Sequence, residues 1–212
     1  MKRRFLNHLL TVLVVSTASL FALPANAADE AADVFIKRLS TDMLDNIKAD
    51  KAIQAGDMAR IIALVDTKIM PNVDFQRMTA SAVGPAWRQA TPEQQKRLQE
   101  EFKTLLVRTY AGALTQVSDQ TIAVRPLRAA PEDKEVVVRS EVKGRGDAIQ
   151  LDYRLEKTPG DGTGWKIYNL NVLGVWLMET YRSQFAQEIN AKGINGLITT
   201  LTERNKANAK KS

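Results

Sequence analysis

Apolar residues in the first half of the chain recur three or four positions apart, and this spacing predicts helices. A first amphipathic helix is expected over residues 29–51. A second begins at Asp57 and ends before Pro71, because proline cannot continue a helix. A third begins at Asp74 and stops at Gly84. Both aspartates suit the N-cap position, where a carboxylate accepts backbone N–H groups.

The longest helix is expected over residues 91–117. Thr91 is its N-cap, Pro92 occupies the first helical position and Gln94 completes a capping box. The apolar stripe of this helix consists of Leu98, Phe102, Leu105, Leu106, Tyr110, Ala113, Leu114 and Val117. A long helix with one apolar face can form a wall of a deep structure.

After residue 120 the hydrophobic period changes to two, which is typical of strands. The pattern predicts four strands, over residues 121–127, 135–143, 148–157 and 165–172. The last two joins are the short Gly-containing segments GRGD and TPGDGTG. Short joins favour antiparallel neighbours, so we expect the strands to form a meander.

Helical spacing returns after Gly174, in VWLMETYRSQFAQEI, and Gly193 separates a last short helix from that segment. The final residues, 205–212, are polar and basic, and we expect them to be disordered. The order of helices and strands predicts an α+β fold around a four-stranded antiparallel sheet.

The first residues have the composition of a secretory signal peptide. A basic start precedes an apolar run, and Ala25-Asn26-Ala27 provides a cleavage site. A membrane anchor is the alternative, but it would need about 20 apolar residues without such a site. We therefore expect residues 1–27 to be removed and residues 28–204 to form a single domain of an exported protein.

Removal of this segment leaves neither histidine nor cysteine, because the only histidine is His8 and the cysteine count is zero. Ser-His-Asp and Cys-His nucleophilic sites, and zinc sites of the usual nitrogen and sulfur ligands, are therefore excluded. The segment also carries three cations, so the remainder has 27 Lys and Arg against 24 Asp and Glu, a net charge of +3. That excess suits an approach to anionic membranes and is too small to argue for nucleic acid.

Carboxylates are the remaining acid–base candidates, and Asp147, Asp152 and Glu156 lie close together in sequence. The last two fall on the polar face of the third predicted strand, where a carboxylate is normally solvated. A glycosidase-like site would need two carboxyls about 5–10 Å apart in a cleft. We therefore do not expect an enzyme, and we predict neither a metal nor a cofactor.

Apolar surface is abundant, and the third predicted strand shows the question that it raises. In AIQLDYRLEK, the alternate positions Ile149, Leu151, Tyr153 and Leu155 are apolar. Packing of the sheet against the helices accounts for most residues of this kind. A twisted sheet that curls around long helices can also leave an apolar cavity, and such a cavity can take acyl chains.

The order of motifs resembles the MlaC family, also called the toluene-tolerance family, of periplasmic phospholipid-binding proteins. The resemblance extends over nearly all of the chain after residue 27. Its first set of residues is Pro71, Asp74-Phe75, Gly84, Trp87-Arg88, Ala90-Thr91-Pro92-Glu93-Gln94, Glu101-Phe102 and Thr109-Tyr110. Its second set is Trp165, Tyr168, Gly174, Tyr181-Arg182, Gln184-Phe185 and Gly193. Asn169 and Trp176 depart from the family pattern, which often has Asp and a small residue such as Ser at these positions.

The resemblance implies helices wrapped around a highly twisted sheet that encloses an apolar pocket for the acyl tails of a phospholipid. It also implies a periplasmic location, an outer-membrane lipoprotein partner complex, an inner-membrane ABC transporter complex and a role in the lipid asymmetry of the outer membrane. We expect a monomer that carries phospholipid as cargo and has no nucleic-acid partner.

We predict that eight residues line the acyl pocket, although each suits an ordinary core equally well. They are Ile69, Phe102, Leu106, Tyr110, Ile149, Leu151, Tyr153 and Val175. Leu155 is expected to be plain core. The alternative to a lipid carrier is a periplasmic module whose apolar groove takes a peptide or a partner helix.

Overall fold

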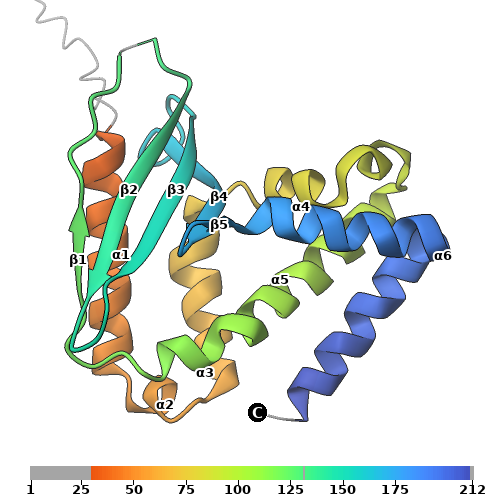
Figure 1. Cartoon of the computed structure of the whole chain (residues 1–212), viewed down its shortest axis with the longest axis horizontal. Coiled ribbons are helices and arrows are strands. Elements are labelled where there is room, and N and C mark those ends of the chain that lie inside the picture. Colours follow the sequence, from red (N-terminus) through yellow and green to blue (C-terminus); the bar gives the residue numbers. More distant parts are fainter. Residues whose placement is uncertain (1–29, 131, 211–212) are drawn as a thin grey trace, which may run out of the picture.

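The structure is a computed structural model that describes residues 30–130 and 132–210. The predicted signal peptide, residues 1–27, lies outside the described residues. The fold is α+β, as predicted. Figure 1 shows the sheet on one side of the molecule and helices from the middle and C-terminal parts of the chain on the other.

Five strands form one antiparallel sheet in the order of the chain. They are β1 (Thr121–Val124), β2 (Glu135–Lys143), β3 (Ile149–Lys157), β4 (Trp165–Val172) and β5 (Val175–Trp176). The predicted meander is confirmed, and the bounds of β2 and β4 agree with the prediction. β1 is shorter than predicted.

The prediction of four strands is wrong, because Val175 and Trp176 form a strand and not the start of a helix. They pair with the end of β4 after a two-residue turn. In that turn Leu173 has a φ of 52° and Gly174 a φ of 86°. Two successive positive φ angles produce a tight hairpin, which keeps Val175 in the sheet.

The N-terminal helices follow the prediction in outline but are divided into shorter segments. These are α1 (Ala32–Ala49), α2 (Lys51–Gln54), α3 (Met58–Leu64), the π-helical segment η1 (Val65–Ile69) and the 3-10 turn η2 (Met70–Asn72). Asp50 ends the first helix and caps the second, since its carboxylate accepts two backbone N–H groups. Asp57 caps α3 in the same way, as predicted.

The helices that follow are α4 (Phe75–Val83), the 3-10 segment η3 (Gly84–Gln89), α5 (Pro92–Leu114) and α6 (Leu177–Ala209). The side chain of Asp74 caps α4, and Thr91 and Gln94 form the predicted capping box of α5. α6 is interrupted at Gly193, where the chain leaves helical geometry with a φ of 69° and a ψ of −174°.

The end of α6 differs from the prediction. Residues 205–212 were expected to be disordered, yet the helix continues through residue 209, and residues 211 and 212 lie outside the described part of the chain. Asn205 is buried, and its Nδ2 donates to the backbone oxygen of Glu101 at 2.9 Å and to its Oε2 at 2.6 Å. These contacts hold the end of the helix against α5.

The buried apolar residues form three clusters. The bundle cluster, from α4, α5 and α6, contains Met78, Ala82, Val83, Leu98, Phe102, Leu105, Leu177, Met178, Tyr181, Phe185, Leu197 and Leu201. The sheet cluster, between α1 and the sheet, contains Ala32, Phe35, Ile36, Leu39, Val136, Val138, Leu155, Trp165 and Ile167. The N-terminal cluster contains Ile47, Ile53, Ile61, Leu64 and Ala111. The core is thus divided, and partly buried apolar residues lie at the edges of the clusters.

Candidate functional site

One face of the sheet is apolar across its three central strands. On β3 the apolar side chains are Ile149, Leu151, Tyr153 and Leu155. Their apolar cross-strand neighbours on β2 and β4 are Val136, Val138, Val142, Ile167, Leu170 and Val172. Because side chains at paired positions point to the same side of a sheet, these residues form one apolar face.

Coverage of this face by other elements decreases from the C-terminal end of β3 to its N-terminal end. Leu155 is fully buried in the sheet cluster beneath α1, so its prediction as core is confirmed. Tyr153 and Leu151 are half-buried, and the Tyr153 hydroxyl lies 3.4 Å from Ser40 Oγ on α1. Burial raises the pKa of the Tyr153 hydroxyl. Ile149, at the start of the strand, is 44% exposed.

The predicted residues on α5 show the same gradient. Phe102, Leu106 and Tyr110 are spaced four apart and lie on one side of the helix. Phe102 is fully buried, with its ring centroid 4.9 Å from that of Tyr181 and 5.2 Å from that of Phe185. Leu106 is half-buried against the bundle cluster, and Tyr110 is 37% exposed. This row therefore also passes from core to surface.

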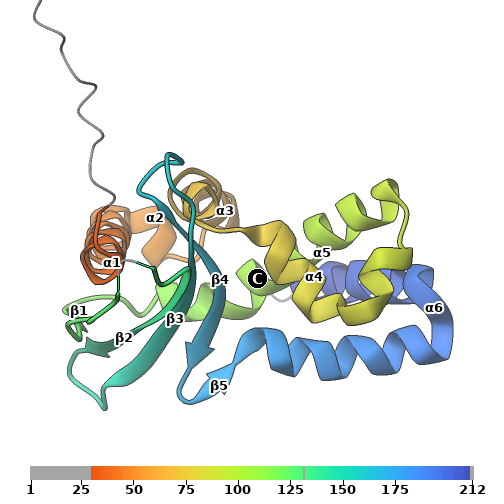
Figure 2. The same ribbon diagram turned by 90° about the horizontal axis from the view of Figure 1, so that it is seen from above.

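The open ends of the two rows belong to the same end of the sheet. α5 ends at Leu114, and a short loop joins it to Thr121. Thr121 pairs with Lys143 at the end of β2, next to the position that faces Ile149. The C-terminal end of α5 runs toward the sheet in Figure 1 and in Figure 2. Tyr110 lies in the last two turns of that helix.

The two remaining predicted residues belong to other elements. Val175 on β5 pairs with Val172, which pairs in turn with Leu151, so Val175 extends the apolar face of the sheet. Val175 is 51% exposed. Ile69 is half-buried at the end of η1. The structure therefore arranges seven of the eight residues in two rows and leaves Ile69 apart from them.

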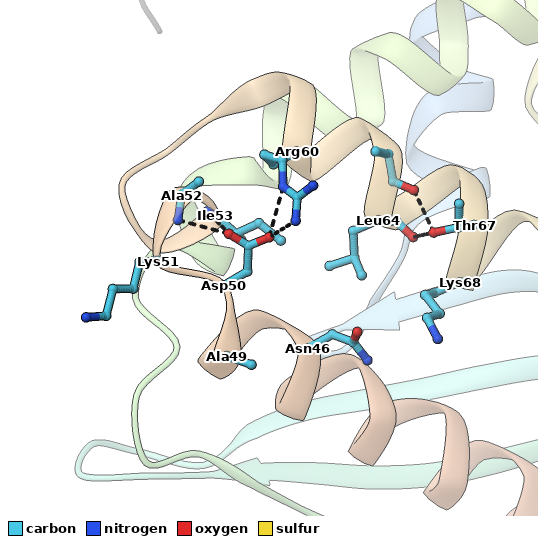
Figure 3. A pocket seen from close by; sticks show the side chains of 11 residues that line it. Asn46, Ala49, Asp50, Lys51, Ala52, Ile53, Arg60, Leu64, Thr67 and Lys68 are labelled. Carbon is cyan, nitrogen blue, oxygen red and sulfur yellow. Dashed lines mark hydrogen bonds and ion pairs between the residues drawn. The ribbon is translucent and has the colours of Figure 1, made fainter.

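An open pocket of about 800 Å³ lies between the C-terminal end of α1, α2 and the α3–η1 segment (Figure 3). It is lined by Asn46, Ala49, Asp50, Lys51, Ala52, Ile53, Arg60, Ala63, Leu64, Thr67 and Lys68. None of the eight predicted residues lines it. Arg60 donates two hydrogen bonds to Asp50 Oδ2, at 3.0 and 2.6 Å, and this contact lowers the pKa of the Asp50 carboxyl.

This pocket was not predicted from the sequence, because its charged residues lie on helix surfaces. The spacing of lysine and arginine residues along a helix is the same whether their side chains face solvent or line a pocket. One signal was present: an aspartate at position 50, followed by KAIQ, is suited to start a new helical turn. It indicates the break between α1 and α2, and with it the corner that the pocket occupies.

The opposite face of the sheet carries charged groups that neutralise one another. Arg77 on α4 donates to Glu135 Oε1 at 2.5 Å and also to Glu156, and its guanidinium lies 3.6 Å from the ring centroid of Tyr168. Hydrogen bonds from Arg77 and Tyr168 lower the pKa of the Glu135 carboxyl. Burial raises the pKa of Glu156, as does its hydrogen bond with Asp74, while Arg77 opposes that rise. The group links α4 to β2, β3 and β4.

The two departures from the family pattern are explained by one neighbouring carboxylate. The Oδ1 of Asn169 accepts two backbone N–H groups, and its Nδ2 donates to Glu179 Oε2 at 2.8 Å. Aspartate could accept the same two groups but could not donate to Glu179. Arg154 pairs with Glu179 at 2.5 Å and lies 4.0 Å from the ring of Trp176. Asn169 therefore contacts Glu179 directly, and Trp176 contacts the Arg154 that pairs with it.

The three carboxylates considered for acid–base chemistry have different surroundings. Asp152 is only 5% exposed, which contradicts the expectation that it is solvated. Its Oδ2 accepts a hydrogen bond from Gln150 at 2.7 Å. Glu156 is bonded to Arg77, and Asp147 is exposed beyond the end of β2. The first two are thus held by polar contacts within the sheet and its covering helix.

Residues 30–130 and 132–210 contain neither a metal-binding cluster nor a membrane-spanning helix. No group of three or more Asp, Glu, His or Cys side chains is placed to hold a metal ion within these ranges. In the same part of the chain, every helix is too short or too polar to span a membrane.

The chain matches a known protein family. The family model described as MlaC protein matches residues 37–203. The chain is 31% identical over 183 residues to the toluene tolerance protein ttg2D of Pseudomonas putida, covering 85% of this chain and 82% of that protein. It is 21% identical over 194 residues to the intermembrane phospholipid transport system binding protein MlaC of Haemophilus influenzae, covering 91% of each.

A solved structure is also similar. It is that of a phospholipid-binding protein from Ralstonia solanacearum in complex with a phospholipid. Its sequence is 48% identical to this chain, and the TM-score is 0.80. The match covers 84% of this chain and 98% of the other.

Proposed function

Since this chain belongs to the MlaC family, we propose that it is a periplasmic phospholipid carrier that holds acyl chains in an apolar pocket. The observation that carries the proposal is the match to the Ralstonia solanacearum protein, which was solved with a bound phospholipid and shares 48% of its residues with this chain. At 48% identity and a TM-score of 0.80 the likeness extends over the whole fold, which supports the same kind of ligand for this chain.

The size of the hydrophobic penalty explains why a carrier is needed. Exposure of an acyl methylene to water costs about 0.8 kcal/mol, so two chains of about sixteen carbons cost on the order of 25 kcal/mol. A protein pocket removes that cost during passage through water. Because the lipid leaves one apolar medium for another, its net transfer free energy can be close to zero, as reversible loading requires. No catalytic group takes part in such a transfer.

We place the acyl chains between the open end of the sheet and α5. Ile149, Leu151, Tyr153 and Val175 supply the sheet wall, and Tyr110, at the C-terminal end of α5 beside Tyr181 of α6, is the proposed helix residue nearest the open end. The gradient of exposure along both rows supports this placement, because apolar side chains at 37 to 51% exposure are stabilised by an apolar ligand. Two further proposed residues, Leu106 and Phe102, lie deeper along α5, and Ile69, at the end of η1, is a proposed wall residue that lies apart from both rows.

The carrier would exchange its lipid with two membrane complexes. In this proposal an outer-membrane lipoprotein complex and an inner-membrane ABC transporter complex are its partners, and exchange with them maintains the lipid asymmetry of the outer membrane. The chain acts as a monomer that encloses one cargo at a time.

Lipid extraction tests the carrier function directly. The mature protein is purified without detergent from cells that express it with its N-terminal segment, and an organic extract is analysed by mass spectrometry. We expect phospholipid at about one molecule per protein. Repeated absence of lipid under mild purification would contradict the carrier function. A co-purifying peptide in its place would support the alternative, a peptide-binding groove.

A further inference from the structure

The pocket in Figure 3 combines an apolar floor with a cationic rim, at which the side chain of Lys51 extends away from Arg60 and Lys68. Ile53 and Leu64 are buried members of the N-terminal cluster, so the floor is continuous with the core. Three cations, Lys51, Arg60 and Lys68, line the same pocket with a single carboxylate, Asp50. This composition suits a ligand that is apolar at one end and anionic at the other.

The single carboxylate is already neutralised. One oxygen of Asp50 accepts both hydrogen bonds from Arg60, and the other accepts the N–H groups of Ala52 and Ile53 at 2.9 and 3.3 Å. Lys51 and Lys68 are exposed and form no ion pair with any side chain in the described ranges. Arg60 still has N–H groups beyond the two that Asp50 accepts. The rim therefore keeps a positive charge.

The wall opposite α1 has an unusual backbone. There the α3 helix widens into the π-helical segment η1, and Thr67 Oγ1 donates to the backbone oxygen of Ala63 at 2.7 Å. π-helical turns are rare and frequently occur at functional sites. Lys68 lies in this turn, and the next residue is Ile69, which belongs to the proposed acyl wall. The pocket is thus adjacent in sequence to one proposed wall residue, which lies apart from the two rows.

We propose that this pocket binds the phosphate ester of an amphiphilic anion. Arg60 and Lys68 contact the phosphate oxygens, Lys51 adds charge at the rim, and Ile53 and Leu64 contact the carbon atoms next to the phosphate. One source of such a group is the headgroup of the phospholipid cargo, and in this form the inference rests on the proposed carrier function. A soluble glycerol phosphate is the other source.

The first arm of the test measures headgroup preference. Delipidated protein is incubated with vesicles of equal parts phosphatidylglycerol and phosphatidylethanolamine, and the lipid it takes up is quantified by mass spectrometry. The unpaired lysines should enrich the anionic lipid, by about fivefold for each lysine near the phosphate. The variant Lys51→Gln/Lys68→Gln should take up the two lipids in nearly equal amounts. High salt should lower the preference of the wild type, because it screens exposed charges.

A matched control separates a local site from net charge. Lys96 and Lys206 are exposed lysines outside the pocket, so Lys96→Gln/Lys206→Gln makes the same change in net charge. This control should keep the full preference. An equal loss in the control, or an unchanged preference in Lys51→Gln/Lys68→Gln, would overturn the headgroup site. Wild-type protein that takes up no lipid at all would instead contradict the carrier function.

The second arm tests the soluble source. Glycerol 3-phosphate is titrated into ¹⁵N-labelled protein, and backbone amide shifts are followed by NMR. Saturable shifts at Lys51, Arg60 and Lys68 that disappear in Lys51→Gln/Lys68→Gln support a site for soluble phosphate esters. Headgroup preference without such shifts assigns the site to the lipid. If the protein shows no headgroup preference in the first arm and no amide shifts in the second, the proposal is overturned.

Discussion

The two ends of the apolar sheet face have similar sequences and opposite surroundings. At one end Leu155 is completely buried beneath α1. At the other end Ile149, Leu173 and Val175 are 44, 65 and 51% exposed. The alternation of apolar and polar residues continues through both ends of β3. Such a pattern specifies which face of a strand is apolar, and it does not specify what covers that face.

The difference has an energetic meaning. Full burial of a leucine side chain stabilises a fold by about 1.5–3 kcal/mol, so the covered end contributes to stability. The open end leaves much of the same kind of surface in water and contributes less. Under the proposed function, a bound acyl chain buries these exposed side chains, and the hydrophobic free energy of that burial then stabilises the complex. The covered end should therefore control folding, and the open end should control binding.

The largest expected effect is at the covered end. Leu155→Ala removes a fully buried side chain between α1 and the sheet and should lower the free energy of unfolding by about 3 kcal/mol. Ile149→Ala, its counterpart at the open end of the same strand, should lower it by less than about 1 kcal/mol. Urea denaturation monitored by circular dichroism measures both. Equal losses would contradict the contrast between the two ends.

A bulky residue in the middle of the row should affect binding more than folding. Leu151 is half-buried between the two ends, so Leu151→Trp should fill space intended for the ligand. We expect the lipid load to fall to less than about half of the wild-type value, with a loss of stability of about 1–2 kcal/mol. Mass spectrometry of extracted lipid gives the load. A folded variant with a full load would show that the pocket lies elsewhere.

The ion pairs at the covered end should show a pH-dependent effect. Arg77→Gln removes the cation that links Glu135 and Glu156, and we expect a loss of about 1 kcal/mol at neutral pH. The lowered pKa of Glu135 means that its stabilisation is present above its ordinary pKa and is lost as the pH falls. The raised pKa of Glu156 lets that carboxyl become neutral early on acidification.

Both effects reduce the difference between wild type and Arg77→Gln at low pH. Thermal unfolding at pH 7 and near pH 4 should show this convergence. Arg125→Gln breaks a more exposed ion pair with Glu141 and serves as the control, with a smaller loss because solvent screens that pair. A constant difference across this pH range would indicate that Arg77 acts through its contact with Tyr168 alone.

The smallest expected effect is a gain in stability at the open end. Leu173 has a positive φ, which is unfavourable for leucine, and its side chain is 65% exposed. Leu173→Asn creates an Asn-Gly turn, the preferred sequence for two successive positive φ angles, and should raise stability by about 0.5–1 kcal/mol. Leu173→Val should lower it, because β-branched residues tolerate this conformation poorly. Differential scanning calorimetry can resolve both shifts.

Local elements were well predicted because their signals are local. The capping box at Thr91 and Gln94 depends on residues three positions apart, and in β2 the buried side chains Val136, Val138 and Ser140 alternate with more exposed ones. The fifth strand was missed because the turn before it places a leucine where the usual signal is asparagine or glycine. The order at the end of α6 depends on Asn205 reaching Glu101, more than a hundred residues earlier, and no local pattern indicates that contact.

The sequence alone determined the α+β order of elements, the absence of histidine and cysteine after residue 27 and the apolar face of β3, because each depends on composition or on neighbours in the chain. It also determined the family resemblance, because the motif residues can be read directly. Only the tertiary structure decided that Leu155 is buried while Ile149 is open, and that Lys51, Arg60 and Lys68 surround one pocket. Burial and the grouping of charges depend on which distant segment packs against each side chain, and that follows from the fold as a whole.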